Sequence, residues 1–317
     1  MTQTNKDYFS GVIGQTNAKK TLSFHIEIQN ETGLLSNFLI VGAFGVGKNK
    51  ITETFAANII KYPEKTVRPT VVVNCASVEN FQDFWDSVMI PFVIDKSYTI
   101  HLDEAHKIPE DVQVMLLSIL NPTPDYKNTY SYQGSQYVID FRKCSFILTT
   151  SDADQLLLPL VNRLTRIDLD NYNIEQLSEI ICNNLKEIKF EKDLTPNIAD
   201  VCRKNARQAI KVSEDIRKYA LSNKIVYFNS EHWGDFCNRL SIKPLGLNDI
   251  EIKILKILKE RKSLSLTCLS AMLGSNTQSV RAFYEPFLLA EGLLNIVTPK
   301  GRELSKYGVE LTNRLKL

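Results

Sequence analysis

The stretch "NFLIVGAFGVGKNK", Asn37 to Lys50, joins a short apolar run to a glycine-rich loop. A continuous apolar run that ends in glycine is typical of a strand buried on both faces of a sheet. The loop matches the phosphate-binding pattern G-x-x-x-x-G-K-[ST] at Gly42, Gly47 and Lys48, but Asn49 replaces the expected hydroxyl residue. This order of strand, loop and helix predicts an α/β nucleotide-binding core.

The loop's chemistry follows from its backbone. Its N–H groups turn toward a polyphosphate, the helix amino terminus adds a favourable dipole, and Lys48 reaches the β- and γ-phosphates. The amide oxygen of Asn49 can ligate Mg²⁺ but lies one atom farther out than a serine hydroxyl. We therefore expect nucleotide binding, with slower or more geometry-sensitive hydrolysis. The remaining residues expected around the phosphates are Gly42, Gly45, Val46 and Gly47.

Strand and helix patterns alternate on both sides of this loop. The expected strands are 37–42, 70–75, 98–104 and 144–150, the first three taken as buried, and the expected helices are 49–61, 81–89 and 110–120. Such alternation predicts a mostly parallel sheet with helices on both faces.

Two acids end the third expected strand, in "IHLDEAH", Ile100 to His106. Asp103 would lie near the metal ion and Glu104 where it polarises an attacking water. The letters "DEAH" also spell a motif of another helicase superfamily, but that class needs a second core for which the chain has no room. His106 reads as a helix-start residue, and His101 as a packed sheet histidine.

Two further residues suit nucleotide hydrolysis. Thr150 ends the next strand beside the acids, where its hydroxyl can orient water or simply cap the strand. Arg163, exposed by a proline-initiated turn, suits an arginine finger that acts on a neighbouring subunit's phosphate. The alternative is an ordinary surface charge.

The segment between residues 121 and 142 interrupts the alternation. It contains two prolines, a central Gly134 and several tyrosines. A surface loop is one interpretation; a β-hairpin that turns near Gln133–Ser135 is the preferred one.

The carboxyl-terminal half predicts two further domains after a nucleotide-binding domain at 1–170. Amphipathic helical patterns fill 171–243, and three helices followed by a two-stranded turn at Pro299–Gly301 predict a winged helix at 244–317. We expect Arg281, Lys300 and Arg302 to contact DNA phosphates without reading sequence. A protein-binding winged helix with solvated charges is the alternative.

Composition sets outer limits. A net charge of +2 over 317 residues confines any nucleic-acid surface to a local patch. The six cysteines form no C-x-x-C pair and predict reduced core residues. With no signal-peptide pattern and no apolar run of about 18 residues, we expect a soluble cytoplasmic protein with no membrane segment.

The order of these motifs resembles the RuvB family, the AAA+ motors of Holliday-junction branch migration. The resemblance runs from about Phe9 to Arg302 and is most specific in the tail, "EPFLLAEGLLNIVTPKGR". It also rests on "VIGQ", "LDEAH", "LTTSD", "LLPLVNRL" and "NARQAIK". It implies an AAA+ core with a helical lid that binds ATP and Mg²⁺ through Asn49 and Asp103.

The resemblance also implies residue roles. Ile13 and Gly14 would line the adenine pocket, Thr150 would be the first sensor, and Arg207 the second. Arg163 matches the finger, and Glu104 the water-activating acid.

The implied activity is an ATP-driven ring, a hexamer on double-stranded or branched DNA, that drives branch migration or translocation. The hairpin at 123–140 falls where the family engages a RuvA-like partner. It lacks the glycine- and alanine-rich sequence familiar there, so a different partner or none is the alternative. The alternatives are a nucleotide-gated DNA-binding scaffold with weak hydrolysis and a clamp or helicase loader.

Three positions depart from the family pattern: Asn49 replaces a threonine, Ala206 a proline and Val161 an arginine. They indicate a divergent, nucleoid-associated protein of phage or mobile-element origin.

Overall fold

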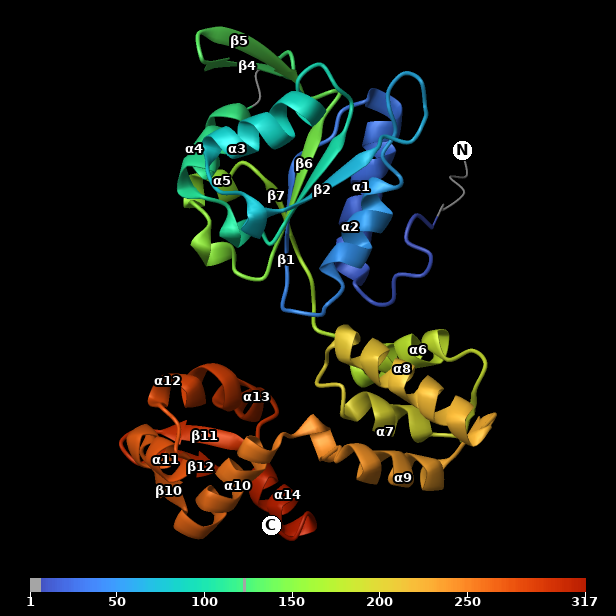
Figure 1. The fold of residues 1–317 in the computed structure, drawn as a ribbon, viewed down its shortest axis with the longest axis vertical. Coiled ribbons are helices and arrows are strands. Elements are labelled where there is room, and N and C mark those ends of the chain that lie inside the picture. Colours follow the sequence, from blue (N-terminus) through green and yellow to red (C-terminus); the bar gives the residue numbers. More distant parts are fainter. Residues whose placement is uncertain (1–6, 122–123) are drawn as a thin grey trace. The chain divides into compact units, whose positions relative to one another are not determined.

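The computed structural model describes residues 7–121 and 124–317. The chain divides into two compact units, Met1–Tyr227 and Phe228–Leu317 (Figure 1). Across the described ranges, no helix is long and apolar enough to cross a membrane.

The first unit is built on a five-stranded parallel sheet with the strand order β2-β3-β6-β1-β7. Its strands are β1 (Phe38–Val41), β2 (Thr70–Asn74), β3 (Thr99–Asp103), β6 (Ser145–Thr150) and β7 (Thr165–Asp168). Val41 at the end of β1 lies opposite Thr150 of β6 and Asp168 of β7. Because all five strands run in one direction, their carboxyl ends form one edge, which receives the residues that follow each strand.

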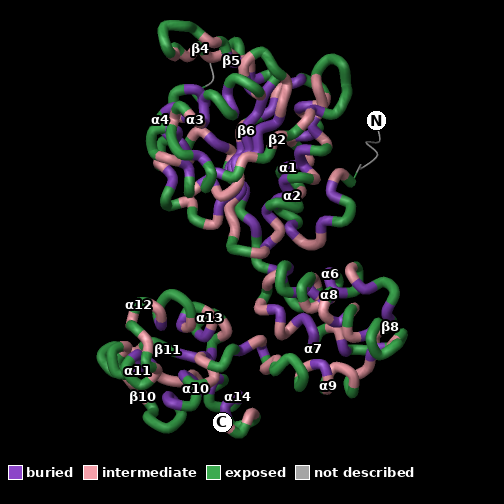
Figure 2. The backbone as a smooth tube through the Cα atoms, in the orientation of Figure 1, coloured by how far each residue is buried: buried purple, intermediate pink, exposed green. Residues whose placement is uncertain are grey.

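Helices cover both faces of this sheet (Figure 1). They are α1 (Thr16–Thr32) and α2 (Lys48–Ala56) on one face, and α3 (Phe81–Phe84), α4 (Glu110–Ile119) and α5 (Leu158–Val161) on the other. Successive strand side chains point to opposite faces, so Phe38 and Ile40 pack with the α1–α2 layer while Leu39 packs with the second layer. The central strands are therefore buried from both sides (Figure 2).

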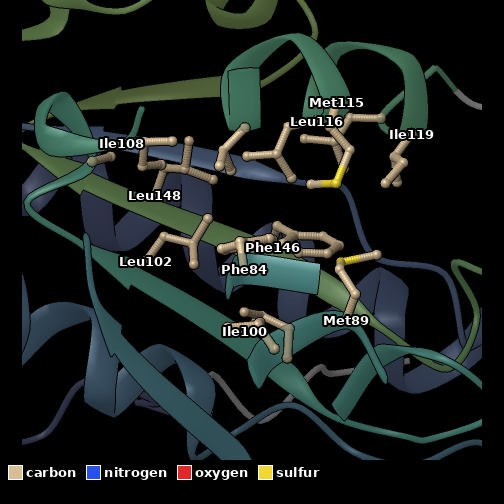
Figure 3. Close-up of a cluster of buried hydrophobic side chains, with 14 of the residues drawn as sticks. Phe84, Met89, Ile100, Leu102, Ile108, Met115, Leu116, Ile119, Phe146 and Leu148 are labelled. Atoms are coloured by element: carbon tan, nitrogen blue, oxygen red, sulfur yellow. The ribbon is translucent and has the colours of Figure 1, made fainter. Parts of the chain in front are cut away.

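The second layer forms the larger apolar core. Phe84, Leu116 and Phe146 are fully buried there, together with Ile100 and Leu102 of β3 (Figure 3). This packing fixes β3 and β6 against each other, and hence the residues at their carboxyl ends.

Strands predicted near 37–42, 98–104 and 144–150 are confirmed by β1, β3 and β6. The prediction that the strand at 70–75 is buried was wrong: β2 lies at the sheet edge, and Val72 is 58% exposed. The sequence reading also missed α1 and β7.

The predicted helix at 81–89 begins as α3 but continues as a π-helical turn, Trp85–Val93. Pro91 lies inside that turn. Proline lacks an N–H and clashes with the preceding turn of an α-helix, which accounts for the wider local geometry.

The predicted hairpin is confirmed as β4 (Lys127–Tyr132) and β5 (Ser135–Asp140). Gln133 and Gly134 connect them with φ values of 48° and 75°, as a two-residue turn requires. Thr123, the first residue of the range predicted for partner binding, lies outside the described residues.

The hairpin's tyrosines pack on their own domain. The rings of Tyr130, Tyr132 and Tyr137 lie 4.8–5.3 Å from the fully buried Trp85, measured between ring centroids. Such aromatic contacts anchor the hairpin to the α3 layer, so these rings are engaged within the chain.

Helices follow the sheet within the same unit: α6 (Ile174–Asn184), α7 (Leu194–Asp200) and α8 (Ala206–Asn223), with the short strand β8 (Lys189–Phe190). The short strand β9 (Tyr227–Phe228) spans the point at which the chain divides into its two units. Asn173 and Gln176 form a capping box at the start of α6. The predicted domain boundaries after residues 170 and 243 remain predictions.

The second unit contains α9 (Ser230–Leu240), α10 (Asp249–Arg261), β10 (Ser263–Leu264), α11 (Leu266–Leu273), α12 (Thr277–Ser279), α13 (Glu285–Ala290), β11 (Leu294–Val297), β12 (Gly301–Leu304) and α14 (Lys306–Arg314). A π-helical turn, Val280–Tyr284, joins α12 to α13. Strands β11 and β12 form the predicted wing, and β10 pairs with β12. Leu258, Leu269, Leu288 and Leu311 are buried in its core.

Glu285 and Arg302, the charged ends of the tail motif, form a buried ion pair. The Arg302 Nε donates to Glu285 Oε1 over 2.5 Å and Nη2 to Oε2 over 3.2 Å. Arg302 is only 9% exposed. The expectation that it contacts DNA phosphate was therefore wrong: its charge is neutralised inside the domain, where it joins α13 to the wing.

Removing one member of this pair should destabilise the winged helix. We expect Glu285→Ala in the full chain to lower the free energy of unfolding of this unit by about 3–5 kcal/mol, because the Arg302 charge would stay buried without a partner. Urea titration of the full chain, followed by far-UV circular dichroism, measures this free energy of unfolding.

The matched control is Glu310→Ala on the exposed side of α14. It should change the same quantity by less than about 0.5 kcal/mol. Equal effects of the two substitutions would contradict a structural role for the ion pair.

Candidate functional site

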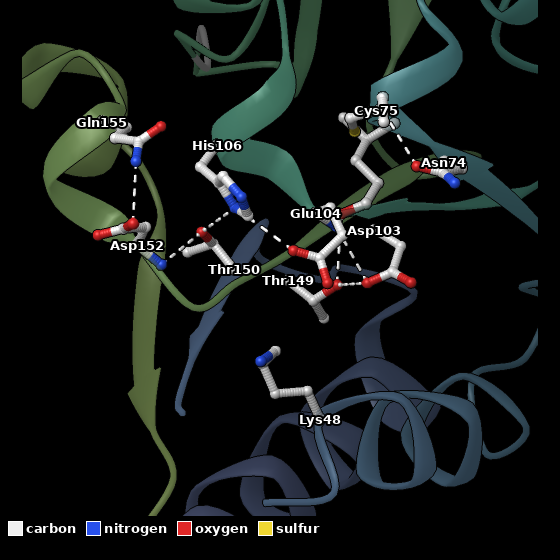
Figure 4. A network of polar contacts seen from close by, with 12 residues as sticks. Lys48, Asn74, Cys75, Asp103, Glu104, His106, Thr149, Thr150, Asp152 and Gln155 are labelled. Atoms are coloured by element: carbon white, nitrogen blue, oxygen red, sulfur yellow. Dashed lines mark hydrogen bonds and ion pairs between the residues drawn. The ribbon is translucent and has the colours of Figure 1, made fainter. Parts of the chain in front are cut away.

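Three strand ends meet at the carboxyl edge of the sheet. β1 leads into the glycine loop, β3 ends at Asp103, and β6 ends at Thr150. Figure 4 shows Asp103 and Glu104 on the same side as Thr149 and Thr150, with the Lys48 side chain extending toward them. The register of the sheet thus assembles residues that are about 50 to 100 positions apart in the sequence.

Lys48 is held by the loop itself. Its ammonium group donates to the carbonyl oxygens of Gly42 at 2.8 Å and Ala43 at 3.2 Å, and lies 5.4 Å from the ring centroid of Phe44. Burial lowers the pKa of Lys48, and the nearby acids act in the opposite direction. The Lys48 residue is 7% exposed, and its ammonium group, bonded to two carbonyl oxygens, is positioned for a polyanion.

Asp103 receives a donor on each carboxylate oxygen. Thr149 Oγ1 donates to Oδ1 over 2.8 Å, and Asn49 Nδ2 donates to Oδ2 over 3.1 Å. Burial by itself raises the pKa of Asp103, but these two hydrogen bonds, the nearby His101 and a third hydrogen bond from the Glu104 N–H to Oδ1 outweigh it, and the pKa is lowered. The carboxylate is therefore ionised at neutral pH, and Asn49 contacts it through the amide nitrogen.

Glu104 has a backbone φ of 53°, in the left-handed region that a non-glycine residue rarely adopts. His106 Nδ1 lies 3.5 Å from Glu104 Oε2 and 3.1 Å from Thr150 Oγ1. Strain at such a residue is typical of functional sites.

Thr150, the predicted sensor, is fully buried and bonded to its neighbours. Its Oγ1 accepts from the Asp152 N–H at 3.0 Å in addition to contacting His106. Thr149, which sequence reasoning passed over, is the threonine that contacts Asp103. Adjacent threonines in one strand point to opposite faces, and the sequence alone does not decide which one faces the acid.

The donor set fits Mg²⁺ as a nucleotide complex. Magnesium usually binds one or two carboxylates, water and substrate phosphates, without a complete protein cage. Asp103 supplies such a carboxylate beside Lys48, and no group of three or more metal-ligating side chains occurs among residues 7–121 and 124–317. Asp103 and Asn49 are the residues that would hold the ion.

The first turn of α8 contacts the glycine loop directly. Asn205 Nδ2 donates to Phe44 O over 2.8 Å, and the Ala206 N–H donates to Gly45 O over 3.0 Å. Gly45 has a φ of 79°, and a Cβ there would lie 2.0 Å from Asn205 Oδ1, so only glycine fits. Arg207, the predicted second sensor, is exposed beside this contact and contributes to lowering the pKa of Lys48.

The chain before α1 also lies against the loop. Gln15 Nε2 donates to Asp170 O over 2.8 Å and to Val46 O over 3.3 Å, and the side chain is 6% exposed. Ile13 and Gly14 are half-buried, and a Cβ on Gly14 would lie 2.9 Å from Gln176 Nε2. This segment therefore lies between the loop and the first helix of the lid, where the predicted adenine pocket would be.

Arg163 lies near the amino ends of the strands, opposite the edge that carries the glycine loop. It precedes β7, whose Thr165 pairs with Phe38 at the amino end of β1. At about 3.3 Å per residue, β1 alone separates these amino ends from the glycine loop by about 10 Å. The side chain is half-buried rather than exposed as expected, and its Nη1 donates to Pro159 O over 3.0 Å.

The other two residues predicted to contact DNA, Arg281 and Lys300, are exposed. Arg281 lies in the π-helical turn before α13, and Lys300 lies in the turn between β11 and β12. Both positions leave their charges accessible to a ligand.

Comparison with known proteins agrees with this arrangement. Residues 244–313 match the model of the RuvB C-terminal winged helix domain. The Holliday junction branch migration complex subunit RuvB of Mycoplasmopsis pulmonis is 24% identical over 97% of this chain and 96% of its own. The same subunit of Thermotoga petrophila is 27% identical over 92% and 86%.

The chain resembles RuvB proteins over nearly its whole length, and its residues 244–313 match the RuvB winged helix. A single-residue mutant of Thermotoga maritima RuvB has 25% identity and a TM-score of 0.74, covering 98% of both chains. The sheet described above has the fold of the AAA+ core of RuvB, and the second unit contains the winged helix that matches the RuvB model.

Within the RuvB family pattern, Ala206 replaces a proline, and the structure explains what alanine permits. A proline has no N–H and cannot make the bond to Gly45 O. Because Ala206 is the first residue of α8 and Asn205 is extended, with φ −119° and ψ 116°, proline would fit this helix start sterically.

Ala206→Pro should therefore loosen the lid without unfolding α8. We expect faster backbone hydrogen–deuterium exchange in residues 44–48 and the first turn of α8, with overall stability changed by about 0.5–1.5 kcal/mol, the value of one hydrogen bond. Mass spectrometry of the full chain measures the exchange. Ala206→Ser keeps the N–H and should match the unmodified chain; unchanged exchange in the proline variant would contradict the contact.

Proposed function

We propose that this chain is an ATP-dependent DNA motor of the RuvB type, which drives branch migration or translocation on double-stranded or branched DNA. One observation carries the proposal: the loop lysine, both strand-end acids and the first turn of the lid converge at one edge of the sheet. Relatives named as branch migration subunits align over both units of the chain.

The site residues have distinct roles in this proposal. Lys48 and the loop N–H groups bind the phosphates, and Asp103 with Asn49 would hold Mg²⁺, which would neutralise phosphate charge when bound. Glu104 accepts a proton from the attacking water, oriented by Thr150. Ile13 and Gly14 contact the adenine, and Arg207 senses the nucleotide from the lid.

Arg163 acts in a neighbouring subunit. It is too far from its own glycine loop to reach bound phosphate, so the site is completed only in an assembly. A head-to-tail interface that closes gives a ring, and we propose a hexamer around the duplex. Arg281 and Lys300 of the winged helix contact DNA phosphates, and the hairpin surface that remains exposed binds a RuvA-like partner.

Asn49 favours a second candidate, a nucleotide-gated DNA-binding scaffold with weak hydrolysis. Its side-chain amide donates a hydrogen bond to Asp103. The position at which the family pattern has a metal-ligating hydroxyl is therefore occupied in this chain by a side chain with a different contact. A clamp or helicase loader is less favoured because the winged helix matches the RuvB model.

Mixing two inactive variants tests the shared site. We expect Lys48→Ala and Arg163→Ala each to reduce ATP turnover at least about 10³-fold. In an equal mixture, roughly a quarter of head-to-tail interfaces regain both residues, so turnover should recover. Phosphate release measures the rate.

The control mixture combines Lys48→Ala with the double variant, in which no interface is complete. Turnover there should stay at the level of the single variants. Absence of recovery in the first mixture would argue against a finger acting between subunits.

Turnover with DNA separates the motor from the scaffold. We expect duplex DNA to stimulate ATP hydrolysis, and Asn49→Thr to raise it by about tenfold, or about 1.4 kcal/mol in activation free energy. Lys50→Thr, at the adjacent exposed position, should have no such effect. If the chain showed no DNA-stimulated turnover and Asn49→Thr gained none, the scaffold would be the better description.

A further inference from the structure

We propose that His101 and Thr149 are positioning residues that orient Asp103 for the metal–nucleotide complex. This inference rests on the nucleotide site proposed above. It extends that site into the sheet, to one buried side chain on β3 and one on β6. Neither side chain belongs to the sequence motifs.

The hydrogen bonds lead from His101 through Thr149 to Asp103, each residue donating to the next. Thr149 Oγ1 lies 2.8 Å from Asp103 Oδ1 and 3.0 Å from His101 Nε2. An ionised carboxylate only accepts, so the single hydroxyl proton of Thr149 points to Asp103. The hydroxyl oxygen is then an acceptor, and His101 must carry its proton on Nε2.

The arrangement is built into the sheet. His101 and Thr149 lie on the adjacent parallel strands β3 and β6, and they are 2% and 0% exposed. Neither side chain has the rotational freedom of a surface group.

Asp103 is consequently held at both oxygens. The His101–Thr149 pair fixes Oδ1 from inside the sheet, and Asn49 fixes Oδ2 from the glycine loop. Asn49 then assists the metal site by orienting the carboxylate. This explains how a chain without a hydroxyl at position 49 can still present an aligned Asp103.

A purely structural role for the pair would be filling space between two strands. Valine fills the volume of threonine, and phenylalanine covers that of histidine, so volume alone predicts that such replacements leave metal binding intact. A positioning role predicts a loss that depends on the missing donor. Partners that orient a metal ligand typically contribute 10–100-fold to affinity.

The test uses the full chain with ADP and Mn²⁺ as a paramagnetic probe for the magnesium position. Thr149→Val should weaken Mn²⁺ binding to the ADP complex by about 10–100-fold, while Thr149→Ser should restore it to within about threefold. Electron paramagnetic resonance gives the affinity, ADP affinity in EDTA reports the phosphate loop alone, and thermal unfolding reports the fold.

His101 supplies the second pair of variants. His101→Gln places an amide N–H near the position of Nε2 and should retain Mn²⁺ affinity, whereas His101→Phe should weaken it as Thr149→Val does. With only four histidines in the chain, long-range ¹⁵N–¹H spectra resolve the tautomer, and His101 should be protonated on Nε2.

The outcomes separate the two proposals. Failure of the unmodified chain to bind ADP in EDTA would reject the nucleotide site itself. Normal ADP binding combined with unchanged Mn²⁺ affinity in Thr149→Val, or a His101 proton on Nδ1, would overturn the positioning role alone. A Thr149→Val variant that fails to fold leaves the tautomer and the His101 pair to decide.

Discussion

The parallel register of β1, β3 and β6 is the constraint on which the candidate site depends. Phe38 lies opposite Ile147, and Ile100 lies opposite Phe146, so the glycine loop, Asp103 and the threonines of β6 emerge at one edge. Apolar layers on both faces hold this register, because a slip of one residue would move each side chain from one packed layer into the other. The chemistry is thus set by packing that is remote from the phosphates.

Two of the three departures from the RuvB pattern are connected through the contacts of this edge. Asn49 donates to Asp103, and Ala206 donates to Gly45 O. Each change replaces a hydroxyl or a proline with a group that adds an N–H donor to the site. The resulting loop is bonded to both the acid and the lid, and the position of the lid follows from the same contacts that hold the loop.

Much of the fold was predictable because local patterns carried it. β1, β3 and β6 are continuous apolar runs, Gln133–Gly134 satisfies the turn of the hairpin, and the wing turns where proline and glycine occur. The edge position of β2 could not be read from its valines, because strand order is a property of the whole sheet. Short β7 was missed because Thr165–Asp168 is mostly polar.

The site was predictable as far as its motifs extend. Lys48, Asp103 and Glu104 are located where the phosphate-loop pattern and strand-end acids indicated. Arg302 was misread, because its partner Glu285 lies 17 residues away and only the folded domain brings the two charges together. The contact between Thr149 and His101 likewise depends on pairing between two strands.

Electron cryomicroscopy of the full chain with a slowly hydrolysed ATP analogue and duplex DNA tests the central claim most directly. The account predicts a closed ring around the duplex, with nucleotide between subunits and Arg163 of each subunit reaching the γ-phosphate held by Lys48 of the next. A monomer on DNA, or a ring in which Arg163 remains on Pro159 O while nucleotide is bound, would contradict it.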